Sequence, residues 1–144
     1  MPVILALDVG DAKIGAATGS TEVRLARPFT VWRSRGRARD AERIQQAACE
    51  LGATVLLVGL PLQEDGAPSP QAERIRRYVE PIATDLELDL VFVDETYSTQ
   101  DAQQHLIEGG SGRRRRQGLE DAAAAAVILQ RYLDRLGAGE EQRA

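Results

Sequence analysis

The stretch Val3-Ile4-Leu5-Ala6-Leu7-Asp8-Val9-Gly10 decides the fold of this chain. Its five leading apolar residues predict a central strand that is buried on both faces of a sheet. Asp8 is the exception in this run, because a carboxylate there is costly to desolvate unless it is paired or binds a cation. The segment Gly10-Asp11-Ala12 predicts a turn that leads into a second strand.

The rest of the chain is expected to form further strands and helices in a regular order. Strands expected at 2–9, 13–18 and 25–32 are joined by short turns and predict an antiparallel meander. Further elements are expected as a helix at 40–51, a strand at 54–60, a helix from Pro70, a strand at 88–94, a short helix between Ser98 and Gly109, and a last helix at 119–136. This order, βββαβαβαα, predicts an α/β fold with a mixed five-stranded sheet flanked by helices.

Two local expectations concern breaks in the helices. Proline inside a helical pattern removes a backbone donor, so Pro81 is expected to end or kink the helix that begins at Pro70. The segment 111–118 contains four arginines between glycines and is expected to be a basic loop.

Length and composition predict one domain at 1–137 with a polar tail at 138–144, within a chain of 144 residues. The net charge of −4 argues against a general nucleic-acid coat protein but leaves a local basic patch open. Cys49 is the only cysteine, which excludes an internal disulfide and leaves an intermolecular one open. The sequence has no signal peptide and no membrane-spanning run, so we expect a cytoplasmic protein.

Two further acids stand at the ends of expected core elements. Glu95 follows the strand-like run 90–94, and Asp121 shares a helical stripe with Ala125 and Ile128. Each acid has an ordinary alternative: Asp8 as a cap of the following turn, Glu95 in an exposed loop, and Asp121 as a favourable charge in a first helical turn. If the three converge, they form an oxygen-only site suited to Mg²⁺ or Mn²⁺, which can activate water for phosphodiester hydrolysis.

Several segments resemble the YqgF family, also called the RuvX-like Holliday junction resolvases. The matching segments, which span nearly the whole chain in the family's order, are 7–17, 58–62 with Asp65-Gly66, 94–99, and 121–125 with 128–130. The resemblance implies an RNase H-like fold and places the family's metal-binding, catalytic acids on Asp8, Glu95 and Asp121. It implies a nuclease that uses Mg²⁺ or Mn²⁺ to resolve branched DNA or, alternatively, to process precursor 16S ribosomal RNA.

The same resemblance bears on contacts to nucleic acid. Lys13 stands where the family usually has arginine, and Thr96-Tyr97 replaces its usual Arg-Leu. We expect phosphate contacts from Lys13 and from the basic run, namely Arg113, Arg114, Arg115 and Arg116, with Tyr97 available to stack on a base. Two more arginine clusters, Arg33–Arg39 and Arg74–Arg77, could also hold a backbone, although the second is more typical of a solvated helix face.

Other readings stay open at this point. Asp8-Val9-Gly10 followed by Gly15 also resembles the phosphate-binding hairpin of actin/hexokinase-type phosphotransferases, which need two such domains. A non-catalytic nucleic-acid adaptor with the same fold is the third alternative. A homodimer would suit junction resolution, because two symmetric nicks need two active sites.

Overall fold

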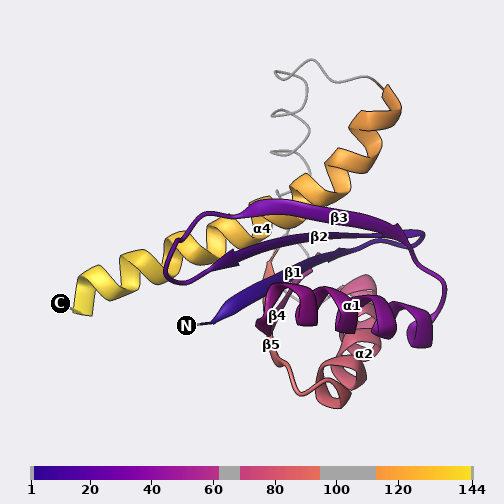
Figure 1. Ribbon diagram of the computed structural model, residues 1–144, viewed down its shortest axis with the longest axis horizontal. Helices are drawn as coiled ribbons and strands as arrows, with labels where there is room; N and C mark the ends of the chain where they lie inside the picture. The colour runs from indigo at the N-terminus through magenta and orange to yellow at the C-terminus, as the bar shows by residue number, and fades with distance from the viewer. Residues whose placement is uncertain (1, 62–68, 95–112, 144) are drawn as a thin grey trace.

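The computed structural model describes the backbone of residues 2–61, 69–94 and 113–143, and side chains within these ranges except for 113–121 and 138–143. Figure 1 shows the arrangement of the elements. They are β1 (Val3–Val9), β2 (Lys13–Ser20), β3 (Arg27–Arg33), α1 (Arg37–Leu51), β4 (Ala53–Leu60), α2 (Pro70–Asp85), β5 (Asp89–Asp94) and α4 (Arg113–Arg143).

The strands form one mixed sheet in the order β3-β2-β1-β4-β5, which confirms the predicted fold class. β1 pairs antiparallel with β2 and parallel with β4, and β4 pairs parallel with β5. β3 runs antiparallel to β2 and therefore points the same way as β1. The carboxyl ends of β1, β3, β4 and β5 consequently meet at one edge of the sheet, which we call the carboxyl edge.

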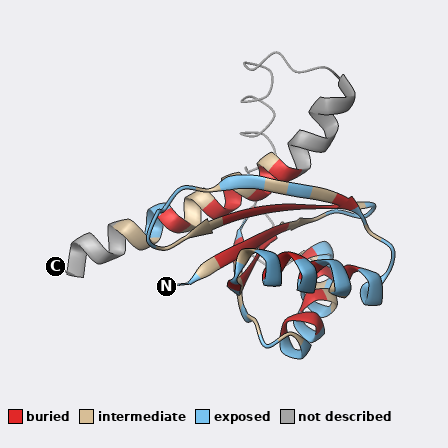
Figure 2. Cartoon of the chain, viewed as in Figure 1, coloured by how far each residue is buried: buried red, intermediate tan, exposed pale blue. Residues whose placement is uncertain are grey.

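Helices cover both faces of the sheet: α1 and α2 lie on one face, and α4 lies on the other (Figure 1). The alternation of β1 divides its side chains between two cores. Leu5 and Leu7 pack with α1 and α2, whereas Ile4 and Ala6 pack with α4. Figure 2 shows buried residues in red along the sheet and on the sides of the helices that face it.

Small residues let α4 approach the sheet closely. Ala125 is fully buried, and a Cβ built on Gly19 of β2 would lie 3.2 Å from the Leu129 side chain. Gln130 of α4 then fixes the loop before β3, because its side chain accepts from the Ala26 N–H at 2.9 Å and donates to the Arg24 carbonyl at 3.1 Å.

The last helix differs from its prediction at both ends. α4 begins at Arg113 instead of residue 119 and continues to Arg143, so the described part of the predicted basic loop (113–118) and most of the predicted tail have helical backbone. Gly118 and the arginine run were the reasons to expect a loop. The segment contains otherwise good helix formers (Arg, Gln, Leu and Glu), and their propensity outweighs one glycine.

Pro81 was expected to end or kink α2, and the first of these alternatives is wrong, because the helix continues to Asp85. Proline removes the N–H that would bond to the carbonyl of Arg77, four residues earlier. That carbonyl accepts from the Arg37 guanidinium of α1 at 3.5 Å instead. No helix of the described residues is long and apolar enough to cross a bilayer.

Candidate active site

Asp8 lies at the carboxyl edge, one residue before the end of β1, and is half-buried. It is on the strand face of Ile4 and Ala6, which pack with α4. Its partner across the β1–β2 ladder is Gly15, so β2 contributes no side chain directly beside the carboxylate. This glycine leaves room next to Asp8 on the face that α4 covers.

A tight turn follows Asp8. The Gly10 N–H donates to the Lys13 carbonyl at 2.9 Å, and a Cβ at Gly10 would lie 3.0 Å from that same oxygen. Glycine is therefore needed here for close approach of backbone to backbone. The turn fixes the start of β2 against the end of β1 and so positions Lys13 relative to Asp8.

Lys13 is on the same sheet face as Asp8, because it precedes Gly15 by two residues on β2. It is half-buried and lies directly across from Arg33, the last residue of β3. Like charges directly opposite each other in a sheet are destabilising, so an anion between Lys13 and Arg33 would relieve their repulsion. This edge thus combines one acid with two cations on the α4 side.

The structure describes the other two predicted acids only in part. Glu95 lies outside the described residues, and Asp121 has described helical backbone in α4 but no described side chain. Their sequence neighbours nevertheless meet. Ala6, two residues before Asp8, shares one core cluster with Val93, two before Glu95, and Ala125, one helical turn after Asp121.

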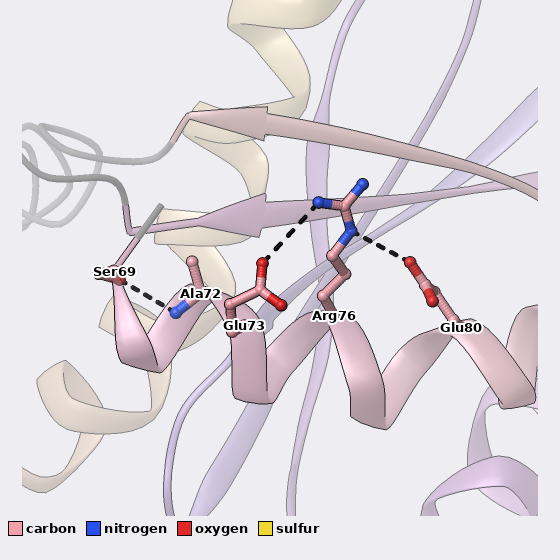
Figure 3. A network of polar contacts seen from close by, with 5 residues as sticks. All are labelled: Ser69, Ala72, Glu73, Arg76 and Glu80. Carbon is pink, nitrogen blue, oxygen red and sulfur yellow. Dashed lines mark hydrogen bonds and ion pairs between the residues drawn. The ribbon is translucent and has the colours of Figure 1, made fainter. Parts of the chain in front are cut away.

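Of the remaining residues predicted to contact nucleic acid, some are described by the structure and others are not. Tyr97 lies outside the described residues, and Arg113–Arg116 are helical in backbone with undescribed side chains. On α2, Arg76 is held by Glu80 at 3.1 Å and Glu73 at 4.0 Å (Figure 3). It also lies over the Phe92 ring, with 5.4 Å to the ring centroid, which fits the expected solvated helix face.

Asp40 is a buried acid that the sequence analysis missed. It lies in the first turn of α1 and is only 1% exposed. Its carboxylate accepts from the Ser34 hydroxyl at 2.5 Å, from the Arg35 N–H at 3.1 Å and from the Tyr78 hydroxyl of α2. The available signal was its spacing of four residues before Ile44, which puts Asp40 on the buried stripe of α1.

The pKa of Tyr78 reflects its place in this network. Burial is the main cause that raises its pKa from 10.0 to about 12, and the hydrogen bond to Asp40 adds to it. The Arg37 guanidinium lies over the Tyr78 ring, 5.5 Å from its centroid, and acts in the opposite direction on the pKa. The phenol therefore remains a donor to Asp40, and the network ties α1, α2 and the end of β3 together.

A cavity of about 190 Å³ opens where this network meets the turn after Asp8. Its walls come from the β1–β2 turn, the segment after β3, and α2. They comprise Val9, Gly10, Asp11, Ser34, Gln71, Arg74, Ile75 and Tyr78. The cavity lies on the α1/α2 side of the carboxyl edge and combines apolar walls with one cation, one acid and an amide.

Sequence comparison finds close relatives over nearly the full chain. The profile of a family described as "RuvX: Holliday junction resolvase" matches residues 2–135. A protein of Bordetella pertussis named "Putative pre-16S rRNA nuclease" is 41% identical over 133 residues, covering 92% of this chain and 94% of that protein. A protein of the same name from Paraburkholderia phytofirmans is 36% identical over 138 residues, covering 96% and 92%.

Structure comparison finds the same fold in junction resolvases. The Thermus thermophilus RuvC bound to a Holliday junction has a TM-score of 0.55 at 14% identity, covering 89% of this chain and 92% of RuvC. The fowlpox virus resolvase bound to junction DNA has a TM-score of 0.60 at 11% identity, covering 93% and 98%. At these identities the likeness establishes the RNase H-like fold of resolvases and nothing finer.

Proposed function

We propose, because this chain belongs to the RuvX family, that it is a metal-dependent nuclease that hydrolyses phosphodiester bonds in structured nucleic acid. The observation that carries the proposal is Asp8. This acid lies at the carboxyl end of the central, otherwise apolar strand, beside a glycine and on the face covered by α4. The carboxyl ends of strands are the usual place for ligands in open α/β sheets.

Three acids are proposed to hold the metal: Asp8, Glu95 and Asp121. The shared packing of Ala6, Val93 and Ala125 supports their convergence. Their oxygen-only donor set fits Mg²⁺ or Mn²⁺, and such a cation, when bound, stabilises the charge that develops on the phosphodiester. The three carboxylates would position the cation at the edge, where a half-buried surrounding strengthens each interaction.

The cations of the same edge are proposed to orient the substrate. Lys13 and Arg33 lie opposite each other on the face of Asp8, so a phosphate between them neutralises their mutual repulsion. Arg113, Arg114, Arg115 and Arg116 are proposed to add phosphate contacts along the first turns of α4. Tyr97 is proposed to stack on a base beside the cut.

Precursor 16S ribosomal RNA is the substrate that we favour. The relatives that carry this name are 36% and 41% identical over more than nine-tenths of this chain. Branched DNA is the second candidate, favoured by the description of the family and assayable with the same protein. Either substrate requires the same hydrolysis, so the acids serve both.

The test is a cleavage screen with purified protein and Mg²⁺ or Mn²⁺. It compares precursor 16S RNA, four-way junctions, flaps and plain duplex DNA. Asp8→Asn should lower cleavage of the best substrate at least about 100-fold, because loss of one ligand disables the site as a unit. Asp89→Asn is the matched control: Asp89 is equally an acid at a strand end, but it is exposed and opens β5 at the opposite edge.

The outcomes separate cleanly. Loss of cleavage in Asp8→Asn with full activity in Asp89→Asn supports the proposal. Full activity in Asp8→Asn would remove this acid from the site. Tight binding of nucleic acid with no metal-dependent cleavage of any substrate would favour the adaptor alternative.

A further inference from the structure

Three arginines near the start of α1 form one exposed basic surface. Arg35, Arg39 and Arg43, which we call the arginine face, line a hollow of about 510 Å³. Arg39 and Arg43 are one helical turn apart, which is about 6 Å of rise. All three side chains are exposed, and the described residues provide none of them with an ion pair.

The pattern is unfavourable without an anion. Like charges four residues apart on a helix repel each other and destabilise it. The acids of α1 do not relieve this. Asp40 is buried and satisfied by other donors, and neither Glu42 nor Glu50 forms an ion pair within the described residues. Arg76 on α2 shows the contrast, because Glu73 and Glu80 flank it (Figure 3).

The topology connects this surface with the candidate active site. Only three residues separate the end of β3 from the start of α1, so the first turn of α1 lies at the carboxyl edge that also carries Asp8. Ser34 lines the cavity beside the turn after Asp8, and the next residue, Arg35, belongs to the arginine face. Arg74 provides a cation inside that cavity, where Asp11 is the one acid among its walls.

We propose that the arginine face binds the phosphodiester backbone of the nucleic acid substrate at nucleotides beyond the cleaved bond. The strand turns over the carboxyl edge, from the acids on the α4 side, past Arg74, to Arg35, Arg39 and Arg43 on the α1 side. The rise between Arg39 and Arg43 matches about two nucleotides of stacked strand, at about 3.4 Å each. Arginine suits this contact because its planar fork binds phosphate oxygens in pairs. The inference rests on the proposed nuclease function.

The test measures binding as a function of salt concentration. The variant R35Q/R39Q/R43Q removes the three charges of the face while keeping polar side chains of similar helix propensity. The control R24Q/R27Q/R135Q removes the same charge from the turn before β3, the first residue of β3 and α4, away from the carboxyl edge. Full-length proteins are titrated, without divalent cations, into fluorescently labelled RNA and DNA duplexes of the same sequence. Emission from Trp32, the only tryptophan, verifies that each variant is folded.

The face variant should lower the slope of log affinity against log salt by about two to three, and the control should leave it unchanged. The slope should fall equally for RNA and DNA, because both offer the same phosphates. A face variant with the wild-type slope, in a protein that still cuts its substrate, overturns this inference alone. A loss confined to RNA or to DNA also contradicts it. Wild-type protein that neither binds nor cuts nucleic acid refutes the proposed function together with it.

Discussion

Two aspartates of this chain occupy core-facing positions for different physical reasons. Asp40 is almost completely buried and accepts hydrogen bonds from Ser34, Arg35 and Tyr78, so its charge is satisfied within the fold. Asp8 is half-buried at the carboxyl edge, beside a glycine and near a lysine. Asp40 therefore holds α1, α2 and the end of β3 together, whereas Asp8 lies at the edge where we propose that the metal binds.

The Asp40 network makes a prediction at the residue scale. Tyr78→Phe removes one of the donors to a buried carboxylate, and it should lower the free energy of unfolding by about 1–3 kcal/mol. Urea unfolding at neutral pH measures this. Tyr132→Phe is the matched control, since Tyr132 is a half-buried tyrosine on α4 outside the network.

The same variant should change the response to alkaline pH. The Tyr78 pKa is about 12 in the folded protein against 10.0 for an unperturbed tyrosine, so the folded state holds the phenol proton more tightly. The stability from this difference is complete below pH 10 and is lost as pH rises toward 12. The stability gap between wild type and Tyr78→Phe should therefore narrow above pH 10. A gap that stays constant from pH 8 to pH 11 would contradict the assignment.

At the scale of elements, α2 shows how a helix tolerates proline. The carbonyl left without its helical partner by Pro81 accepts from Arg37 of the neighbouring helix. Local contacts fix the other helix ends. Ser69 caps the same helix by accepting from the Ala72 N–H at 3.0 Å, and Gly52 ends α1 in the left-handed conformation with φ of 71°.

Pro81→Ala should stabilise the protein by about 1–3 kcal/mol, because alanine restores the helical bond to the Arg77 carbonyl at an exposed position. Greater freedom of the unfolded chain offsets part of this gain. The measurement is the urea midpoint at an unchanged m-value. Lower stability would mean that the contact from Arg37 is worth more than a helical hydrogen bond.

The sequence was sufficient wherever short-range patterns controlled the outcome. Apolar runs predicted β1 and β4 almost to the residue, and the predicted start of α2 at Pro70 is confirmed. It was insufficient where distant residues decide. The Asp40–Tyr78 bond joins positions 38 apart, and Arg37 reaches a carbonyl 40 residues away, so neither has a local signature.

At the scale of the whole molecule, the candidate site follows the same division. The sequence alone indicated a candidate site at the end of β1, because Asp8 interrupts an apolar strand. That Ala6, Val93 and Ala125 share a cluster depends on sheet order and on the docking of α4, which residue spacing alone does not determine. The arginine face likewise combines the start of α1 with an edge formed by strands far apart in sequence.

The number of protomers on the substrate should depend on its symmetry. A four-way junction offers two equivalent cuts and should recruit two protomers, whereas one RNA end should recruit one. Analytical ultracentrifugation of complexes with the Asp8→Asn protein, which we expect not to cut, measures both stoichiometries. A single protomer on a junction, where wild-type protein makes two symmetric nicks, would contradict this prediction.

The contact of α4 with the first three strands also determines when one face of the sheet becomes covered during synthesis of the chain. One face of the sheet, with Ile4, Ala6 and Ala17, is covered only when Ile128 and Leu129 of α4 pack on it. The hydrogen bond between Ala26 and Gln130 likewise joins residues 104 positions apart. Ribosomes add about 5–20 residues each second. The nascent meander therefore spends several seconds with an uncovered apolar face until α4 emerges. Slow translation between β3 and α4 would lengthen this interval and favour capture by chaperones, so synonymous codons there can change the yield of folded protein while the finished molecule stays the same.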